Sequence, residues 1–381
     1  MQRFKNHLKH LIRRHSKDLS NHLTERFHSN CLLLFCALIA FQVAGCRTVA
    51  YYHQAALGQW QIERNKNPIQ QLKKDPETNP ELKEKFETIQ DIRRFAFWNL
   101  NLPAEDAYDT YVALDRDYVV WNVTACPEFS MEPHRWWYPF LGKLKYRGYF
   151  DEAEAHQYAQ TLETKGHDVA VEGVVAYSTL GWFRDPVFNT FMDWPDRAIA
   201  ELLFHELSHR KVFLTGKTEW NEAFAVVTAR AGVREWLTSK SLWDELETYE
   251  TEIELEETFI ELVLETKQEL EQLYASFDSN DSDNPNSSSA IMSITGKSAQ
   301  KQSIYDAFRD RFENAKVQNP SLEVYEGWMA RPLNNARLSA IDTYYQWVPM
   351  FQKLQKRYTG DWSRFFDAVE RLDNEQSLED S

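Results

Sequence analysis

The pentapeptide HELSH at 205–209 constrains this chain more than any other feature of its sequence. The surrounding stretch, 198–211, contains no Gly or Pro and is rich in apolar residues, which predicts a helix that starts near Pro195. Residues four apart lie on one face of a helix, so the imidazoles of His205 and His209 can reach one metal ion. The alternative is a buried helix whose histidines are satisfied by carbonyl groups.

A third metal ligand is predicted at Glu222. A second helical stretch covers about 221–237, and Gly216 marks a turn between the two helices. Antiparallel packing would bring Glu222 to face His205 and His209. Two histidines and one carboxylate leave a coordination position open, which is the catalytic rather than the structural pattern of zinc sites. The other ligands that the sequence offers are Glu219, Glu235, Asp193 and His167.

This set of residues predicts one Zn²⁺ per chain and a hydrolytic reaction. Zinc lowers the pKa of a bound water towards about 7. Glu206 is predicted to be the general base that takes a proton from this zinc-activated water and passes it to the leaving amine. A partner for the developing oxyanion is also needed. The candidates for this partner are Tyr177, Tyr149, Tyr344, Arg337 and Asn335, of which Tyr177 is assigned the catalytic role.

The segment Ala176–Leu180 is predicted to be a strand edge that holds extended peptide or protein substrate. The predicted substrate-binding residues are Ala176, Ser178, Asn335, Arg337 and Tyr344. If the substrate presents a free α-ammonium group, Glu128 and Glu172 are the acids that could receive it.

The first 45 residues predict a lipoprotein signal peptide. A basic stretch precedes the apolar run at 31–44, which is too short for a membrane span and ends in VAGC at 43–46. VAGC resembles the bacterial lipobox, so Cys46 is predicted to carry lipid and to attach the protein to the membrane of the cell envelope, with its domain in the periplasm. Arg47 is not the aspartate linked with inner-membrane retention, which favours the outer membrane. An uncleaved signal anchor and a misplaced start codon are the alternatives.

Net charge and cysteine content limit the functions that the chain can have. The net charge is −15 although the leader is basic, which argues against nucleic acid as a partner. Cys126 is the one cysteine after Cys46, so it is expected to be a small buried residue rather than a nucleophile.

The expected fold class is α+β, mostly helical, with a small mixed β-sheet followed by the HELSH helix and a helical C-terminal portion, as in zincins. The expected domains are the signal peptide 1–45, a catalytic region 46–240, and a helical region 241–381 with a low-complexity loop at 278–302. The predicted strands cover 118–124 and 145–150, and two more, hinged at Gly173, cover 168–183. The predicted helices cover 80–100, 152–165, 242–277, 303–317, 334–357 and 361–373. The helix over 242–277 has a near-heptad apolar pattern that Glu256 and Lys267 interrupt.

Several short motifs together resemble the bacterial putative aminopeptidase family. They are AGC (44–46), VWNV (120–123), PEFS (127–130), YRGYF (146–150), AYSTLGWF (176–183), DP (185–186), FHELSH (204–209), NE (221–222) and LNNA (333–336). The resemblance implies a lipid-anchored zinc peptidase with a glutamate ligand. The chain departs from the family pattern at Ala229, where members often carry a Glu, and this puts the support of a ligand histidine in doubt.

The function favoured by these observations is a zinc-dependent peptidase, with aminopeptidase action implied by the family resemblance. The alternatives are a zinc endopeptidase of envelope proteins, a zinc hydrolase that is not a peptidase, and a non-catalytic lipid-anchored binding protein. The last has no need for Glu206, so the complete His-Glu-His-Glu set argues against it.

Overall fold

The fold is described from a computed structural model, which covers residues 46–138, 142–282, 294–345 and 347–372. The chain divides into two compact units, Met1–Trp60 and Gln61–Ser381. The predicted signal peptide, 1–45, lies outside the described residues. Cys46, the predicted lipidation site, is the first residue of helix α2 (Cys46–Arg64). None of the helices in the described part of the chain has both the length and the apolar character needed to cross a membrane.

Within the described residues, every strand lies between residues 67 and 188. The strands are β1 (Asn67–Pro68), β2 (Thr110–Val112), β3 (Val120–Pro127), β4 (Trp136–Tyr138), β5 (Gly142–Leu144), β6 (Arg147–Tyr149), β7 (His167–Val174) and β8 (Val187–Phe188). These described strands form three small sheets, with the orders β1–β2–β8, β6–β3–β7 and β4–β5. The first is mixed, because β2 pairs antiparallel with β1 and parallel with β8, and the other two are antiparallel. The single mixed sheet expected from the sequence is therefore divided into three.

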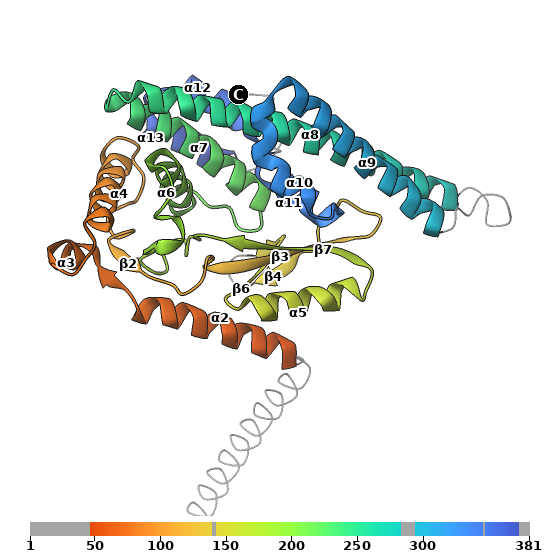
Figure 1. Cartoon of the computed structure of the whole chain (residues 1–381), viewed down its shortest axis with the longest axis horizontal. Coiled ribbons are helices and arrows are strands. Elements are labelled where there is room, and N and C mark those ends of the chain that lie inside the picture. The colour runs from red at the N-terminus through yellow and green to blue at the C-terminus, as the bar shows by residue number, and fades with distance from the viewer. Residues whose placement is uncertain (1–45, 139–141, 283–293, 346, 373–381) are drawn as a thin grey trace, which may run out of the picture. The chain divides into compact units, whose positions relative to one another are not determined.

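The helical elements of the described chain after α2 follow. They are α3 (Ile69–Lys74), α4 (Pro80–Trp98), α5 (Glu152–Glu163), η1 (Asn189–Phe191), α6 (Asp196–Lys211), α7 (Thr218–Ser239), α8 (Trp243–Ser282), α9 (Ile294–Gln318), η2 (Pro320–Tyr325), α10 (Glu326–Ala330), α11 (Asn335–Tyr345), α12 (Val348–Arg357) and α13 (Trp362–Arg371). From residue 196 onward every described element is helical, which confirms the predicted α+β, mostly helical fold class (Figure 1). The helix predicted over 334–357 is broken between α11 and α12, where Pro349 occupies the first turn of α12.

Local sequence explains where several helices begin. The side chain of Asn79 accepts a hydrogen bond from the backbone N–H of Glu81 and caps α4. Asp151 accepts from the N–H of Glu154 in the same way and caps α5. Both caps satisfy donors that have no partner inside the helix.

The sheet β6–β3–β7 lies between helices. α5 packs on one of its faces and α11 on the other (Figure 1). The prediction of two strands hinged at Gly173 is wrong, because β7 continues through Gly173 to Val174 and residues 175–186 form a loop. Gly173 serves packing instead: a Cβ atom there would lie 2.3 Å from Cγ of Tyr118, whose ring covers this position.

The centre of the larger unit is α7, which packs against α6 and is buried over most of its length. Phe224 of α7 contacts Phe351 of α12 and both Phe365 and Phe366 of α13, with ring centroids 5.8–6.0 Å apart. The last two helices therefore complete the core around α7.

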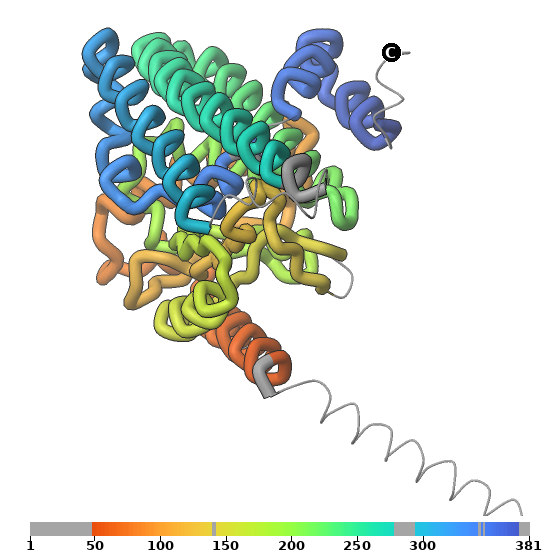
Figure 2. The backbone as a smooth tube through the Cα atoms, turned by 90° about the vertical axis from the view of Figure 1, so that its right-hand side faces the viewer, coloured from red at the N-terminus to blue at the C-terminus, as the bar shows by residue number. Residues whose placement is uncertain are grey.

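A second apolar core lies between α8, α9 and η2. Figure 2 shows α8 and α9 side by side, and Phe259, Phe308 and Phe312 are buried between them. The two helices also extend into the segment 278–302, which was expected to be a loop: α8 continues to Ser282 and α9 begins at Ile294. Residues 283–293 lie outside the described part.

Candidate metal centre and active site

The loop that joins the two motif helices is short and internally bonded. It covers 212–217, and in it Gly216 has a φ of +75°, in the left-handed region that favours glycine. The side chain of Asn221 closes the loop: its Nδ2 donates to the carbonyl oxygen of Leu214 and its Oδ1 accepts from the Leu214 N–H, both at 2.8 Å. Asn221 thereby fixes the first turn of α7, in which Glu222 follows.

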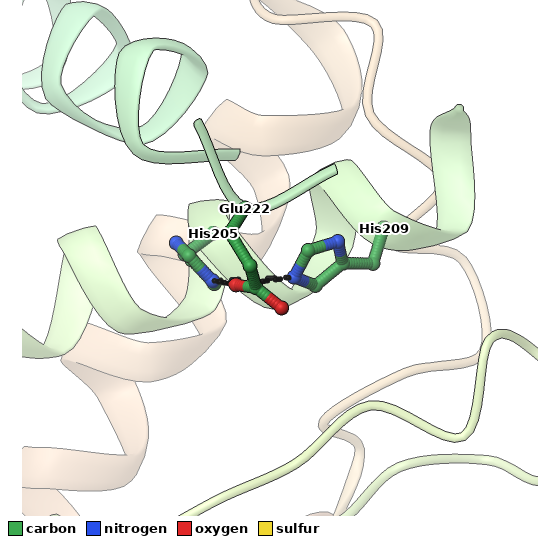
Figure 3. A group of neighbouring side chains, drawn as sticks. All are labelled: His205, His209 and Glu222. Carbon is green, nitrogen blue, oxygen red and sulfur yellow. Dashed lines mark hydrogen bonds and ion pairs between the residues drawn. The ribbon is translucent and has the colours of Figure 1, made fainter. Parts of the chain in front are cut away.

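The ligand atoms of His205, His209 and Glu222 converge, and the Glu222 carboxylate lies between the two rings (Figure 3). His205 Nε2 lies 3.2 Å from both Glu222 Oε2 and His209 Nε2, and His209 Nε2 lies 3.5 Å from Glu222 Oε2. Ligands placed tetrahedrally at about 2.0–2.1 Å from zinc are separated by about 3.3–3.4 Å from one another. The three distances therefore fit three corners of a zinc tetrahedron. The Nε2 atoms face each other and Glu222, not the carbonyl groups of a purely structural arrangement.

The other ligands that the sequence offered, Glu219, Glu235, Asp193 and His167, do not belong to this group of the described residues. Glu219 instead pairs with Lys145 at 2.5 Å and with Arg135 at 2.9 Å. Glu235 accepts a hydrogen bond from the indole of Trp362 at 3.0 Å.

Glu206, between the two histidines, is a buried carboxylic acid. Burial raises its pKa, His205 and His209 lower it, and the charges of Glu222 and Asp185 raise it again, so that the pKa lies above its ordinary value. A base whose pKa is shifted upward from that of a free carboxylate is better matched to proton transfer near neutral pH. The position therefore suits a general base.

The pKa values of Glu222 and His209 depend on the charge of the other group. Burial raises the pKa of Glu222, but the imidazoles of His209 and His205 outweigh burial and hold this pKa well below its ordinary value. Burial lowers the pKa of His209, and the carboxylate of Glu222 reverses this and raises it. Nδ1 of His209 is buried, and no group in the described part of the chain hydrogen-bonds to it. A link between this unpartnered Nδ1 and the departure from the family pattern at Ala229 stays a prediction.

Tyr344 is the predicted oxyanion partner that lies at this centre. Its ring centroid is 6.3 Å from that of His205, and 37% of the residue is exposed. The charge of Glu222 raises the pKa of Tyr344 well above its ordinary value, and its hydroxyl is a proton donor near neutral pH. Tyr344 thus combines access to solvent with proximity to His205.

Tyr177, the predicted catalytic tyrosine, has a different environment. Its ring packs against Phe150, and burial raises its pKa together with the charges of Asp185 and Glu63. Tyr149 is buried in β6 against Tyr158. The catalytic role of Tyr177 stays a prediction.

The predicted substrate-binding residues of the 176–180 segment lie in a loop without strand pairing. Ala176 is buried, and the hydroxyl of Ser178 donates to Asp185 at 3.4 Å and accepts from the N–H of Leu180. Asp185 also accepts from the N–H and the hydroxyl of Thr179, at 3.1 and 2.6 Å. The bonds of Asp185 fold the segment into a turn, and this is the physical reason why it is not an edge strand.

Asn335 and Arg337 have contacts that explain them as structural residues. Asn335 is fully buried and bonds to the hydroxyls of Tyr274 and Tyr305 and to three backbone carbonyls. Arg337 donates to three carbonyls and lies over the ring of Trp328, 4.0 Å from its centroid. These bonds give no support to a role in substrate binding.

The two acids suggested for an α-ammonium group also have other partners. Glu128 accepts from the hydroxyl of Ser298, and Glu172 pairs with Arg331 at 2.9 Å. Neither Glu128 nor Glu172 belongs to the group formed by His205, His209 and Glu222 in the described residues.

Tyr108 is a residue at the site that the sequence did not single out. It is 3% exposed and has a φ of +55°, a strained conformation for a bulky residue. Its N–H donates to the carbonyl oxygen of Asp185 at 2.7 Å. Burial, then the charges of Glu206 and Asp185, raise the pKa of Tyr108 well above its ordinary value. No sequence pattern marks this position.

Comparisons with known proteins identify the family. None of the curated proteins matches the chain, and no solved structure matches it. The family model described as "Putative aminopeptidase" matches residues 50–381, which is most of the chain and includes both motif helices. The chain therefore belongs to the putative aminopeptidase family.

Proposed function

We propose that this protein is a zinc-dependent peptidase whose metal ligands are His205, His209 and Glu222. The observation that carries the proposal is the mutual spacing of the three ligand atoms, 3.2, 3.2 and 3.5 Å, next to the buried carboxyl group of Glu206. Two imidazoles and one carboxylate are donors that suit Zn²⁺, and three protein ligands are the catalytic number. When bound, zinc supplies Lewis acidity that lowers the pKa of water towards about 7 and polarises a carbonyl oxygen.

Glu206 is the proposed general base. It precedes Leu207 on α6 and lies within the electrostatic reach of both histidines and of Glu222. Its carboxylate accepts the proton of the attacking water and delivers it to the leaving amine, so one group serves both halves of the reaction. Because Glu206 is not one of the three ligands, its loss should remove turnover without removing the metal.

Tyr344 is the proposed donor to the oxyanion that develops on the attacked carbonyl. A tyrosine hydroxyl has an ordinary pKa of about 10, so it is protonated near neutral pH and can donate a hydrogen bond. A donor that is already oriented stabilises charge in the transition state at little reorganisation cost. We place Tyr344 in this role ahead of Tyr177, because Tyr344 contacts a ligand histidine.

The substrate is proposed to be a peptide or protein, and aminopeptidase action is the first activity to test because of the family to which the chain belongs. Peptides with a free amino terminus and the same peptides with an acetylated amino terminus separate the possibilities. Cleavage of the free form only supports aminopeptidase action. Cleavage of the acetylated form identifies an endopeptidase.

The decisive experiment is elemental analysis of the full-length protein, purified in detergent without chelator, beside Glu222→Ala and Glu206→Gln. The proposal requires one zinc per chain in the wild type and in Glu206→Gln, and its loss in Glu222→Ala. Hydrolysis should be present in the wild type only. Zinc-free wild-type protein would refute the enzyme and leave a lipid-anchored binding protein as the better account.

The cellular location is also a proposal. The VAGC sequence at 43–46 supports lipid attachment at Cys46 and a bacterial envelope location with the domain in the periplasm, on the outer rather than the inner membrane. Mass spectrometry of the amino-terminal peptide tests acylation. A Cys46→Ser variant should be found uncleaved and without lipid.

A further inference from the structure

A cluster of charged and aromatic side chains joins four helices next to the metal centre. Arg230 of α7 donates to Glu256 at 2.7 Å and to Glu257 at 3.2 Å, both on α8. Its Nε lies 3.8 Å from Glu201 of α6, and its guanidinium lies 5.7 Å from the ring centroid of Tyr345 on α11. The hydroxyl of Tyr345 donates to Glu256. We refer to these five residues as the Arg230 cluster.

Three members of the Arg230 cluster are sequence neighbours of residues at the metal centre. Tyr345 directly follows Tyr344, and Glu201 lies one helical turn before His205. Arg230 lies about two turns after Glu222 on α7. The fixed geometry of the cluster is therefore transmitted over one or two turns of rigid helix to the groups that would bind metal and substrate.

Of these three connections, the one on α11 is the shortest along the sequence, because Tyr345 is the direct neighbour of Tyr344. Glu256 receives two donors, Arg230 from α7 and Tyr345 from α11, and so connects the helix of a metal ligand to the helix of Tyr344. Tyr345 is at the last position of α11, where the backbone carbonyls have no helical partners and the chain is most easily displaced. The hydrogen bond from Tyr345 to Glu256 restrains the last turn of α11, and with it the side chain of Tyr344.

Stability alone gives little reason for this arrangement. The side chain of Arg230 is 4% exposed, and burying a guanidinium requires partners that offset its desolvation. Apolar residues of similar volume often stabilise a protein as well as a buried ion pair does. Glu256 also interrupts the near-heptad apolar pattern of α8. Positioning is the advantage that an ion pair and a hydrogen bond offer over an apolar contact, because both have directional geometry.

We propose that Glu256 and Tyr345 are positioning residues, which hold the end of α11 against α7 and so orient the hydroxyl of Tyr344 at the metal centre. The inference rests on the proposed function, in which Tyr344 donates a hydrogen bond to the oxyanion. It gives the acidic helix α8 a part in catalysis although none of its side chains is a ligand of the proposed metal.

The test is a double-mutant cycle on full-length, zinc-loaded protein, with the variants Tyr344→Phe, Tyr345→Phe and both together. Two readouts are used: kcat on the peptides cleaved by the wild type, and the affinity of an alanine-based phosphinic peptide, which mimics the tetrahedral intermediate. Tyr344→Phe should lower both by about 10²-fold, and Tyr345→Phe by about tenfold, because the donor is displaced rather than removed. The double variant should be no worse than Tyr344→Phe alone.

Two further variants exclude a general loss of structure. Glu256→Leu, which removes the acceptor of the Tyr345 hydroxyl, should resemble Tyr345→Phe, with zinc content unchanged. Tyr274→Phe is the matched control, because it also removes a hydroxyl that bonds inside the protein, to Asn335 at 2.9 Å, away from the cluster. It should lower thermal stability with kcat kept.

The outcomes separate the two proposals. In the first outcome, the wild type contains zinc and hydrolyses peptides, but Tyr345→Phe either equals the wild type or is additive with Tyr344→Phe. This result overturns the positioning role and leaves the peptidase proposal intact. A wild type without zinc or hydrolysis overturns the peptidase, and with it the positioning of Tyr344. A zinc-loaded wild type that does not bind the phosphinic peptide overturns the positioning role as well.

Discussion

Replacement of Asn335 by Leu separates a structural role from a substrate-binding one. Oδ1 of Asn335 accepts from the hydroxyls of Tyr274 and Tyr305 at 2.9 and 2.7 Å. Its Nδ2 lies 3.0–3.1 Å from the carbonyl oxygens of Pro127, Glu128 and Ser130. Leu has a similar volume but neither donor nor acceptor, so the substitution removes the bonds and keeps the packing.

The expected loss follows from the partners that remain. The carbonyl of Glu128 still accepts from Lys301, and that of Pro127 from the N–H of Ser130. The carbonyl of Ser130 keeps no such donor in the contacts described, and an orphaned buried group costs about 1–3 kcal/mol. The other lost hydrogen bonds cost about 1 kcal/mol each. Five bonds are lost in all, so we expect a total loss of about 5–7 kcal/mol. This is a large part of the roughly 5–15 kcal/mol by which a domain is stable.

The assay is urea unfolding followed by circular dichroism, with zinc content and kcat measured well below the transition. Asn79→Ala is the control, since it removes one exposed hydrogen bond, to the N–H of Glu81, and should cost about 1 kcal/mol. Asn335→Leu should retain its zinc and most of its activity when folded. A variant of near wild-type stability that has lost turnover would refute the reasoning and restore Asn335 as a substrate-binding residue.

Three shorter predictions follow from other contacts. Glu222→Gln should weaken zinc binding by at least tenfold in a competition titration, because it removes the ligand charge; unchanged affinity would exclude Glu222 as a ligand. The Cys126 thiol, whose pKa burial raises to about 12, should resist alkylation at pH 8 until the protein is unfolded, and rapid labelling of the native protein would contradict its burial. Gly232→Ala should destabilise the protein by about 1–2 kcal/mol in thermal unfolding, since the new Cβ would lie 2.7 Å from Leu100 Cδ1 and 2.9 Å from Phe204 Cδ2; greater stability would show that this packing is looser.

The convergence of the three proposed ligands could be anticipated from the sequence because it depends on local geometry. Spacing of four residues puts His205 and His209 on one helix face, and a short loop with a glycine brings the next helix alongside. The side chain of Asn221 then fixes the register of Glu222. None of these steps requires knowledge of distant residues, so the pattern was sufficient.

The surroundings of the centre depend on contacts between distant segments, and the sequence could not supply them. Ala176–Leu180 is predicted to be a strand edge, but no sequence pattern shows that Asp185 bonds to Thr179 and folds the segment into a turn. Gly173, predicted to be a hinge, is instead the place where the ring of Tyr118 packs. For the same reason the sequence did not single out Tyr108, whose pKa the charge of the distant residue Glu206 helps to raise.

Glu256 interrupts the near-heptad apolar pattern of α8, and this interruption carries information about the neighbours of the helix. A carboxylate inside an apolar heptad stripe is costly unless a cation or a hydrogen-bond donor meets it, so its presence in α8 implies a partner on whatever helix packs there. The structure supplies both, Arg230 on the helix of Glu222 and Tyr345 on the helix of Tyr344. The sequence could therefore state that α8 faces a buried charge, but not which one. Both partners belong to helices that carry residues of the proposed active site. The positioning role proposed for Glu256 therefore rests on a deviation from the heptad pattern about 50 residues after the HELSH motif.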